Sequence, residues 1–585
     1  MINLYHRNSL LNNKWKIKKC DERESLMIAQ KHNLSLIVGK LLTLRNIKDE
    51  QVQNFLNPIF NNNIPNPFDL KDMDKSINRT IENIIKKKKI GIIADYDVDG
   101  STSAALLYNF LSFFKCSISL KIPDRLNEGY GPNKRIMDEF IKENINLVFS
   151  LDCGTTSFEI LDHPNYKEID IIIIDHHISE YKLPRIYSVI NPNRFDENNK
   201  LKDLAAVGLT FLFIMGLRKI LRENNYFNDK NTEPNLLNNL DLVALGTVCD
   251  VVNLSYYNRN FIIKGLEIIK KRTHKGISQI IDNSNINHTP TATDLSFIIG
   301  PQLNAASRVD DSSLSHKLLI SNNLIEIETI TKKLFLLNEK RKLIEKNILE
   351  QSLEQAKKQF NQKFLLVYDF GWHKGVLGII ASRLVEKFNK PAVVISLDQN
   401  IGIGSSRSIK QIDLGNIILM AKQEGLLLSG GGHKMAAGLK IQKNLLEKFH
   451  QYLIQSFEQF SESLFQKINL YDVKLFINEI NLDLLENLEN LEPFGNGNEE
   501  PKFIVQGLRI DHSEVVKEKH ILVFFRSNFG RNIKGISFNS VGTNLGENLI
   551  NNKSAKFDFG CSIKKNRFKD VLQPQLIIED AMLVN

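Results

Sequence analysis

The sequence has few cysteines and no paired cysteine motif. Its 585 residues include five cysteines, none of them in a CxxC pair. This absence excludes a zinc ribbon and gives no sign of a disulfide framework. Residues 1–19 lack the apolar core of a signal peptide, and the longest membrane-like run, residues 209–217, is much too short to span a bilayer. We therefore expect a cytoplasmic protein with no membrane-spanning part.

The chain has fewer acidic than basic residues. Lys and Arg number 76 against 67 Asp and Glu, which gives a formal net charge of +9 and a pI near 9.0. An excess of basic residues favours a polyanionic partner. The chain is also rich in Lys, Asn and Ile, as an AT-biased genome would produce, so the charge has two possible origins. The length exceeds what one hydrophobic core usually supports and predicts about three domains.

Closely spaced carboxylates follow the first strong strand signal. The apolar run 91–94 ends in Asp95, Asp97 and Asp99, and Gly100 and a series of small residues then begin a predicted helix. Such carboxylates repel one another, and a divalent cation is the usual way to offset that repulsion. The same turn carries no GxGxxG motif, which excludes a nucleotide-binding oxidoreductase of the Rossmann type.

The pattern recurs twice downstream. The apolar runs 147–151 and 169–174 predict two more strands, buried on both faces of a parallel sheet. The side chains that directly follow these runs are Asp152, Asp175, His176 and His177. A further carboxylate, Asp250, follows a helix-like apolar segment. Because the carboxyl ends of parallel strands meet at one edge, we expect these groups to converge there. Oxygen and imidazole ligands suit Mn²⁺ or Mg²⁺ better than a thiolate-preferring metal.

Four of these segments together resemble the motifs of a known family. DYDVDG (95–100), LDCGT (151–155), DHH (175–177) and ALGTVCDVV (244–252), in this order, resemble those of the DHH phosphoesterases. The order and spacing of all four carry the resemblance, since DHH alone would be a weak signal. Later segments resemble one branch of the family, the single-strand-specific 5′→3′ DNA exonucleases. This resemblance covers roughly residues 70–585.

The resemblance implies phosphodiester hydrolysis with two metal ions, Mn²⁺ or Mg²⁺, in each active site. The expected metal ligands are Asp97, Asp99, Asp152, His176 and Asp250. Asp152 would bridge the ions, with Asp97 and His176 on one ion and Asp99 and Asp250 on the other. Asp95 and Asp175 are expected to orient the ligands. His177 is expected to point away from His176 and to bind the scissile phosphate or protonate the leaving oxygen.

Three further segments carry candidate substrate contacts. In the loop 123–132, Arg125 by resemblance grips the DNA backbone, although a salt bridge with a carboxylate is an equal alternative. In the polar, turn-rich segment 300–311, the residues that resemble a strand-holding motif are Gln302, Asn304 and Arg308; Asn304 could equally cap a helix. The segments SSRS and GGGHKMAAG resemble the DHH-associated domain. Their candidate contacts for the 5′-terminal phosphate are Ser405, Ser406, Arg407, Gly431, Gly432 and His433.

We predict a multidomain α/β protein. Its expected parts are an N-terminal segment (1–75), a parallel-sheet phosphoesterase domain (76–320), a long connecting helix (321–361), a smaller α/β DHH-associated domain (362–465) and a C-terminal oligonucleotide-binding (OB) barrel (466–585). The barrel mixes cations and aromatic residues, as single-strand-binding surfaces do: Lys517, Lys519, Phe524, Phe525, Arg526, Arg531, Lys534, Lys564, Lys565 and Arg567. Residues 1–75 show no chemistry.

The resemblance implies a 5′→3′ exonuclease that degrades single-stranded DNA to 5′-mononucleotides in DNA repair and recombination. Family members work with a helicase and with single-strand-binding protein, and we expect a monomer. One alternative is another DHH phosphoesterase that acts on short oligonucleotides, cyclic dinucleotides or pyrophosphate. A second is a DNA-binding scaffold that has lost catalysis. Activity on long single strands against dinucleotides separates the first alternative, and Mn²⁺ binding separates the second.

Overall fold

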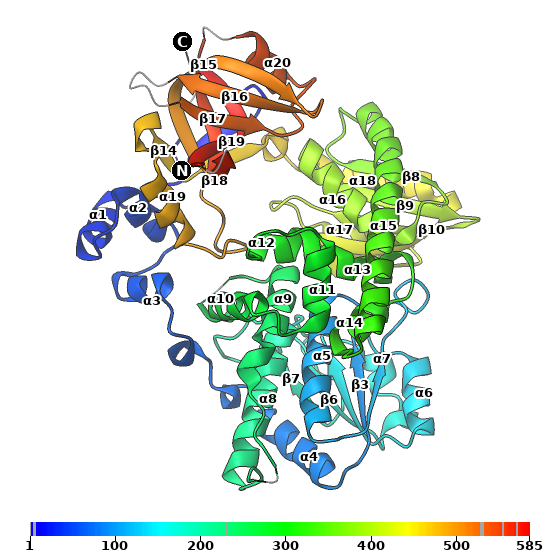
Figure 1. Cartoon of the computed structure of the whole chain (residues 1–585). Helices are drawn as coiled ribbons and strands as arrows, with labels where there is room; N and C mark the ends of the chain where they lie inside the picture. The colour runs from blue at the N-terminus through cyan, green and yellow to red at the C-terminus, as the bar shows by residue number, and fades with distance from the viewer. Residues whose placement is uncertain are drawn as a thin grey trace. The chain divides into compact units, whose positions relative to one another are not determined.

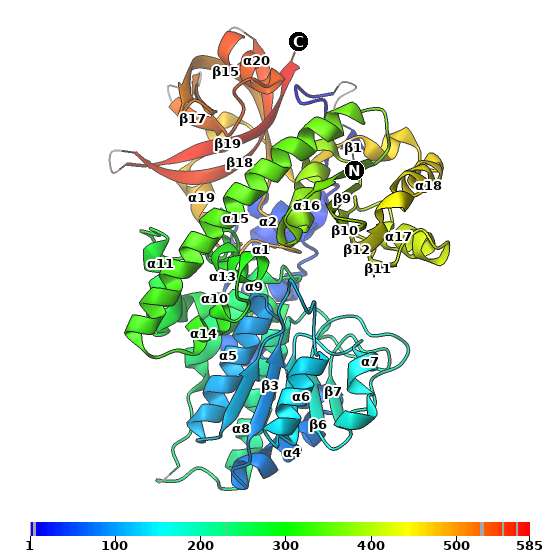
Figure 2. The same ribbon diagram turned by 90° about the vertical axis from the view of Figure 1, so that its right-hand side faces the viewer.

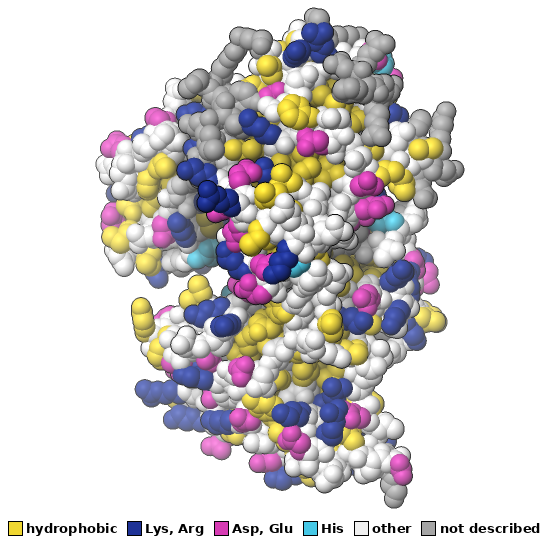
Figure 3. Space-filling model, turned by 90° about the vertical axis from the view of Figure 1, so that its left-hand side faces the viewer, with side chains coloured by type: hydrophobic (Ala, Val, Ile, Leu, Met, Phe, Trp, Pro, Cys, Tyr) yellow, Lys and Arg dark blue, Asp and Glu magenta, His cyan; other side chains and the backbone are white. Residues whose placement is uncertain are grey.

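The computed structural model describes residues 2–3, 8–229, 231–254, 256–526, 532–552, 555–568 and 571–584. The chain forms two compact units, one of residues 60–461 and one that combines residues 1–59 with 462–585 (Figures 1 and 2). No helix among the described residues is long and apolar enough to cross a membrane. Among the described residues drawn in Figure 3, Lys and Arg side chains are interspersed with Asp and Glu side chains.

The larger unit begins with a five-stranded parallel sheet. Its strands, in spatial order, are β4 (Ile118–Lys121), β3 (Ile90–Ala94), β5 (Leu147–Leu151), β6 (Asp170–Ile174) and β7 (Ser188–Ile190). The three central strands are almost wholly buried, as the apolar runs predicted. Successive residues alternate between two cores: Phe149 and Ile172 lie in one, and Val148 and Ile171 in the other.

Helices cover both faces of this sheet. The helices between residues 73 and 283 are α4 (Met73–Ile85), α5 (Val98–Phe113), α6 (Lys134–Lys142), α7 (Phe158–Leu161), α8 (Ala206–Glu223), α9 (Leu240–Cys249), α10 (Tyr256–Lys270) and α11 (Lys275–Asn283). Helices α5 and α8 contribute to the larger core, whereas α6 and α7 contribute to the smaller one. Figure 2 shows α5 and α6 on opposite sides of the strands.

The segment predicted to be turn-rich is helical. After α12 (Ala292–Asp294) and a π-helical turn (Leu295–Ile299), α13 runs from Gly300 to Val309 and α14 from Leu314 to Ile320. Polar residues suggested a loop at 300–311, but the buried side chains Leu303, Ala306 and Val309 recur at helical spacing and bury one face of α13. The predicted long helix is confirmed as α15 (Leu324–Lys358).

A second, mixed sheet follows α15. Its spatial order is β11 (Ser429–His433), β12 (Ala436–Gln442), β10 (Ile401–Arg407), β9 (Ala392–Asp398) and β8 (Leu365–Phe370). The accompanying helices are α16 (Leu377–Phe388), α17 (Leu414–Gln423) and α18 (Leu446–Glu458). The glycine-rich segment forms the exposed edge strand β11, and its role as a phosphate contact stays a prediction.

The smaller unit is a β-barrel joined by the N-terminal segment. Its six-stranded sheet has the order β14 (Val473–Leu475), β15 (Phe503–Val516), β16 (His520–Arg526), β17 (Asn532–Ser537), β19 (Val571–Val584) and β18 (Lys556–Phe568), closed by a β15–β18 pairing. The helices of this unit are α1 (Glu22–Lys31), α2 (Leu36–Leu44), α3 (Val52–Leu56), α19 (Leu482–Glu489) and α20 (Asn544–Asn551). Arg531 lies outside the described residues, as do the side chains of Arg526 and Arg567.

The N-terminal segment is part of this barrel's fold. A three-stranded sheet joins β1 (Ile2–Asn3) and β2 (Lys14–Ile17) to β13 (Ile468–Tyr471), and β2 pairs with β13 in parallel. Helices α1 and α2 share their hydrophobic core with the barrel strands. The predicted segment 1–75 is therefore divided between the two units at residue 59, and the other predicted domain boundaries stay predictions.

Candidate metal centre and active site

The carboxyl end of β3 presents the first carboxylates. Asp97 caps α5, and its side chain accepts a hydrogen bond from the Gly100 amide at 3.0 Å. Asp99, in the first turn of α5, accepts from the amides of Ala206 and Val207 at the start of α8. Gly100 is needed here because a Cβ atom at this position would lie 2.3 Å from the Asp95 carbonyl oxygen. The tight turn thus places the acidic side chains of this motif over the strand end.

The next strand, β5, delivers Asp152. This residue has a positive φ of 58°, a conformation that most side chains avoid and that often marks a functional position. Its carbonyl oxygen accepts a hydrogen bond from the Tyr130 hydroxyl at 2.8 Å. Its carboxylate is 2% exposed, and the Oδ1 atom has no hydrogen-bond partner among the described residues.

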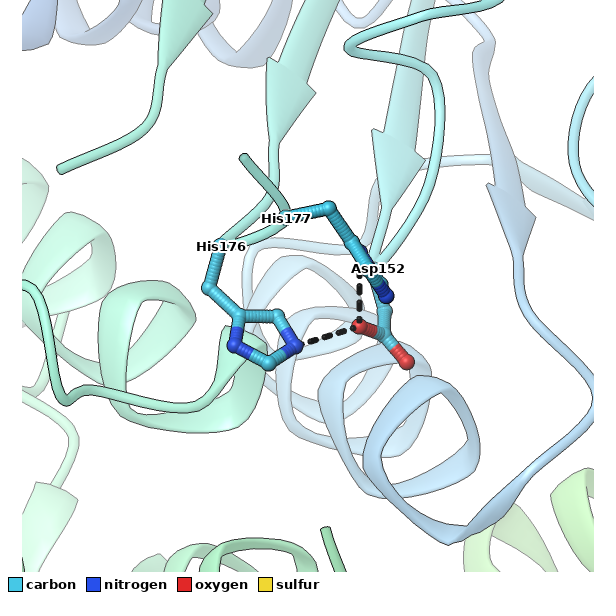
Figure 4. A group of neighbouring side chains, drawn as sticks. All are labelled: Asp152, His176 and His177. Carbon is cyan, nitrogen blue, oxygen red and sulfur yellow. Dashed lines mark ion pairs between the residues drawn. The ribbon is translucent and has the colours of Figure 1, made fainter. Parts of the chain in front are cut away.

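The histidines that follow β6 are held by two kinds of contact. Asp175 Oδ1 accepts from the backbone amides of His176 and His177 and lies 2.7 Å from His177 Nδ1. Although burial alone would raise the pKa of Asp175, the hydrogen bond and charge of His177 hold that pKa below its usual range. The amides of Asn191 and Asn193 donate to the carbonyl oxygens of His177 and His176. Contrary to expectation, the two imidazole rings face the same carboxylate, with centroids 4.7 Å apart (Figure 4).

His176 lies at the centre of the cluster. Its Nε2 atom is 3.3 Å from Asp152 Oδ1, 3.5 Å from Asp250 Oδ2 and 3.9 Å from Asp99 Oδ2. Three sets of ligand atoms each lie within 4.8 Å of one another: Asp152, His176 and His177; Asp99, His176 and Asp250; Asp95, Asp97 and Asp152. The sequence-based grouping placed His176 with Asp97, whereas the structure places it with Asp99 and Asp250.

The protonation chemistry of the cluster fits a pair of cations. Burial and the neighbouring Asp97 charge raise the pKa of Asp99 to about 7. Burial and the neighbouring Asp99 charge raise the pKa of Asp250 to about 9. Burial and the charge of His177 lower the pKa of His176 to about 4, which keeps a neutral imidazole available as a ligand. Buried atoms without a hydrogen-bond partner among the described residues of this site are Asp95 Oδ1, Asp152 Oδ1 and His176 Nε2. Hard divalent cations would satisfy these atoms and relieve the repulsion.

Arginines from three elements surround the same site. The Arg125 guanidinium lies over the Tyr96 ring at 4.8 Å, and no described carboxylate forms a salt bridge with it. Arg308 donates to the Gly375 carbonyl oxygen; burial and the charges of Arg125 and Arg341 lower its pKa to about 9. Burial and the charge of Arg125 also lower the pKa of Arg407. These guanidiniums repel one another, and a bound polyanion would relieve that repulsion.

Some of the remaining candidates on the second sheet face open space, whereas others are hydrogen-bonded or packed within the sheet. Arg407 Nη1 lies 3.4 Å from Ser405 Oγ, whereas the buried Ser406 hydroxyl donates to the Ala437 carbonyl oxygen within the sheet. A Cβ atom at Gly431 would meet open space. One at Gly432 would lie 2.3 Å from the Ala436 carbonyl oxygen. His433 Nδ1 accepts from the Met435 amide. The SSRS and GGGH segments thus lie on strands of one sheet, with β12 between them.

Gln302 lies in a separate groove. The groove has a volume of about 540 Å³, and its charged lining residues are Arg341, Lys342, Glu345, Lys346 and Arg383. Gln302 donates to Ser284 Oγ, and its own Oε1 atom is buried without a partner among the described residues. Phe297, 76% exposed, forms part of an apolar wall. Asn304, another candidate on α13, likewise has a buried Oδ1 without a described partner. The roles of Gln302 and Asn304 stay predictions.

Several residues that shape the site were not predicted. Tyr130, Asn191 and Asn193 hold the strand ends through the contacts above. His316 on α14 is 1% exposed, and its Nε2 lies 3.1 Å from the Asp95 carbonyl oxygen. These groups lie outside the motifs that they support. The asparagines of NPN (191–193) were the one local signal, because such clusters mark turns that often bind backbone groups.

Comparison with known protein families covers most of the chain. Residues 89–247 match the N-terminal domain of the DHH family, residues 361–459 the DHHA1 domain, and residues 471–580 the RecJ OB domain. The single-stranded-DNA-specific exonuclease RecJ of Salmonella typhimurium is 32% identical over 506 residues, 84% of this chain and 87% of that protein. The chain belongs to the RecJ family. The RecJ protein of Haemophilus influenzae is 29% identical and covers 96% of this chain and 99% of its own length.

Solved RecJ structures share the fold. The Mn²⁺ complex of Thermus thermophilus RecJ has a TM-score of 0.81 at 23% identity and covers 97% of this chain and 79% of that chain. An exonuclease RecJ bound to manganese has a TM-score of 0.58 at 29% identity and covers 67% of this chain and 96% of its own. The predicted family and the predicted architecture of parallel sheet, second α/β domain and OB barrel are therefore confirmed.

Proposed function

We propose that the chain is a metal-dependent exonuclease that degrades single-stranded DNA from its 5′ end to 5′-mononucleotides, in DNA repair and recombination. The observation that carries the proposal is the convergence of Asp99, Asp152, His176 and Asp250 around shared ligand positions, in a chain of the RecJ family. Family members are named single-stranded-DNA-specific exonucleases across bacteria as distant as Salmonella and Bacillus.

The proposed cofactors are two ions of Mn²⁺ or Mg²⁺; solved RecJ structures are described as complexes with Mn²⁺, with Mg²⁺ or with manganese. The residues that would hold them are Asp97, Asp99, Asp152, His176 and Asp250, and Asp95 offers a ligand atom in one set with Asp97 and Asp152. When bound, such a pair activates water and stabilises charge at a phosphoryl group. Asp152 belongs to two of the three ligand sets, so it is the carboxylate best placed to bridge two ions.

Protein groups around the cluster would position the strand. His177, with 48% of its side chain exposed, is the imidazole that a substrate can reach. Asp175 holds its Nδ1, so we assign His177 to the scissile phosphate or to protonation of the leaving oxygen. Arg407, Ser405 and His433 would hold the 5′-terminal phosphate, so that the next linkage lies at the cluster. That arrangement would release one nucleotide per cut.

Arg125 and Arg308 would bind backbone phosphates beside the cluster. Neither forms a salt bridge with a described carboxylate. The charge of Arg125 lowers the pKa of both Arg308 and Arg407, so the three guanidiniums share one electrostatic environment. The groove that Gln302 lines would bind the DNA backbone further along the strand. Arg341 lines this groove, and its charge also lowers the pKa of Arg308. We further propose that the enzyme acts as a monomer in the cytoplasm, on strands exposed by a helicase and covered by single-strand-binding protein.

The decisive experiment uses end-labelled single strands, matched duplexes and dinucleotides with Mn²⁺ or Mg²⁺. We expect a 5′-labelled strand to yield labelled mononucleotide at once, while a 3′-labelled strand shortens progressively and the duplex resists. Preferential cleavage of dinucleotides or cyclic dinucleotides would instead identify a short-substrate phosphoesterase. Failure to bind Mn²⁺ in calorimetry, together with intact DNA binding, would identify a scaffold.

A further inference from the structure

Three large apolar side chains are exposed beside the histidines of the metal cluster. They are Ile178, Tyr181 and Phe195, with 81%, 96% and 52% of their surfaces exposed; we call them the rim patch. Ile178 directly follows His177, and the loop that carries Tyr181 leaves β6 through the same histidines. Large apolar side chains that gather at the edge of a polar site indicate a binding surface rather than a stability element.

Hydrogen bonds join the two loops of the rim patch to each other and to the cluster. The Phe195 amide donates to Ser179 Oγ at 2.7 Å, and the Ser179 amide donates to the Asn193 carbonyl oxygen at 3.3 Å. The Asn193 side chain in turn donates to the His176 carbonyl oxygen. The segments 178–181 and 193–195 therefore lie side by side, within a few residues of the proposed ligands.

The backbone under the patch is held in place although its side chains are exposed. Arg194, with a side chain only 9% exposed, forms ion pairs with Asp72 and Asp196 and donates to the Val189 carbonyl oxygen. This anchoring fixes the residue next to Phe195. A ligand would therefore meet rings on a preformed surface and would order little backbone on binding.

Charged groups near the patch suit a ligand with both rings and phosphates. The exposed Lys182 follows Tyr181 and lies over the Phe158 ring, and the exposed Lys202 lies beside Asn193, which donates to its carbonyl oxygen. The acidic neighbours in the same two loops are Glu180, which precedes Tyr181, and Asp196, which follows Phe195 and is paired with Arg194. Neither Tyr181 nor Phe195 packs on another ring in the part of the chain that the structure describes, and 96% and 52% of their surfaces are exposed. Aromatic faces flanked by cations are the chemistry that stacks bases of single strands.

We propose that the rim patch stacks nucleobases of the DNA strand next to the linkage being cut. The proposal rests on the proposed exonuclease function and adds a base-binding contact on the phosphoesterase domain, supplied by side chains outside the four motifs. A base lies one sugar away from its phosphate, so a phosphate at His177 brings its own or the next base to side chains a few residues along the loop. Stacking tolerates every base, which suits an enzyme that must accept any sequence.

Fluorescence tests the contact without catalysis. Both native tryptophans are buried, Trp15 at 2% and Trp372 at 5% exposure, so Tyr181→Trp introduces the exposed tryptophan that reports on the patch. In EDTA, we expect oligo(dT) to quench this tryptophan, whereas an abasic strand of equal length, which has phosphates but no bases, quenches little. Equal quenching by both strands, or none by either, would overturn the proposal.

Kinetics give the second readout. We expect Tyr181→Ala and Phe195→Ala each to raise KM for long single strands about tenfold with kcat nearly unchanged, since one base stack is worth roughly that factor. Tyr181→Leu separates the alternatives: a stacking site loses affinity with leucine, whereas a patch that docks an apolar protein segment keeps its DNA kinetics. Phe360→Ala, at an exposed ring elsewhere in the same unit, is the control and should change nothing. If the wild type degrades single strands and the variants keep its KM and kcat, the stacking role of the rim patch is rejected and the exonuclease function stands. If the wild type itself is inactive, the exonuclease function is rejected.

Discussion

Asp152 Oδ1 and His176 Nε2 lie 3.3 Å apart in the buried centre of the cluster, and neither atom has a hydrogen-bond partner among the residues that the structure describes. Two unsatisfied polar atoms at this distance are costly in a protein interior unless a third group binds both. Asp250 and Asp99 approach the same imidazole nitrogen within 3.5 and 3.9 Å. The pair therefore defines the position where a cation would contribute most to the site.

Asp152→Asn should remove catalysis while the fold remains. Loss of the bridging carboxylate should lower kcat by about three orders of magnitude or more, because bound metal contributes several kcal/mol to the transition state. Calorimetry should show weaker Mn²⁺ binding than in the wild type. Asp241→Asn alters a buried aspartate at the far end of α9 and serves as the control. It should keep the kcat and the Mn²⁺ affinity of the wild type. Wild-type turnover in Asp152→Asn would remove this residue from the centre.

The strands of the metal site could be predicted from sequence because their signals are local. Three apolar runs end in acidic or imidazole residues, and β3, β5 and β6 begin and end within a residue of those runs. Helix α13 escaped prediction because its many polar residues and the Gly300–Pro301 start resemble a turn, although Gln302 and Ser307 are buried in the fold together with the apolar residues. The grouping of ligands also escaped, since sequence order does not show that His176 turns toward Asp250 rather than Asp97.

Arg407→Ala should chiefly impair the use of 5′-phosphorylated strands. The Arg407 guanidinium is bound to a backbone oxygen and a serine hydroxyl but to no described carboxylate, so it can bind a phosphate. We expect the KM for 5′-phosphorylated DNA to rise about ten- to a hundredfold, as for loss of a charged hydrogen bond. The KM for 5′-hydroxyl DNA should change little, and Arg407→Lys should restore part of the difference. Equal losses on both substrates would contradict the assignment.

Lys346→Ala tests whether the groove beside Gln302 contacts the DNA backbone. Lys346 lines the groove with Arg341, Lys342 and Arg383. If Lys346 neutralises one phosphate, the slope of log affinity against log salt should fall by about 0.7, with no change on dinucleotides too short to reach it. Lys332→Ala, at an exposed lysine of the same helix that pairs with Glu328, is the control. An unchanged slope in Lys346→Ala would mean that the strand leaves by another path.

Asp580→Ala should loosen the N-terminal strand from the barrel. This fully buried carboxylate accepts hydrogen bonds from Ser9, Asn13, Trp15 and Asn469, most of which lie at the opposite end of the chain. Its removal leaves buried donors unsatisfied, at a cost of about 3–5 kcal/mol. Hydrogen exchange in residues 8–17 should accelerate, whereas hydrolysis of short strands persists. Glu579→Ala, at the neighbouring exposed residue paired with Lys502, should leave exchange unchanged. Equal exchange in both variants would show that the carboxylate does not hold the strand.

Asp241 should make the stability of the larger unit depend on pH. Burial raises the pKa of this carboxyl, on the first turn of α9, from 3.8 to about 7. Between these values the folded chain binds a proton that the unfolded chain releases, so the free energy of unfolding falls as pH rises. At pH 8 the carboxylate is charged in both states, and its burial costs roughly 4 kcal/mol at about 1.4 kcal/mol per pKa unit.

Asp241→Asn should therefore stabilise the protein, and the gain should grow by roughly 2–3 kcal/mol from pH 5 to pH 8. Urea unfolding in EDTA, followed by circular dichroism at both pH values, measures this change without a contribution from bound metal. Asp398→Asn, at an exposed residue of the same unit, is the control for loss of one carboxylate. A gain that is the same at both pH values would show that Asp241 is already ionised in the fold at pH 5, because its contribution would then no longer vary with the proton.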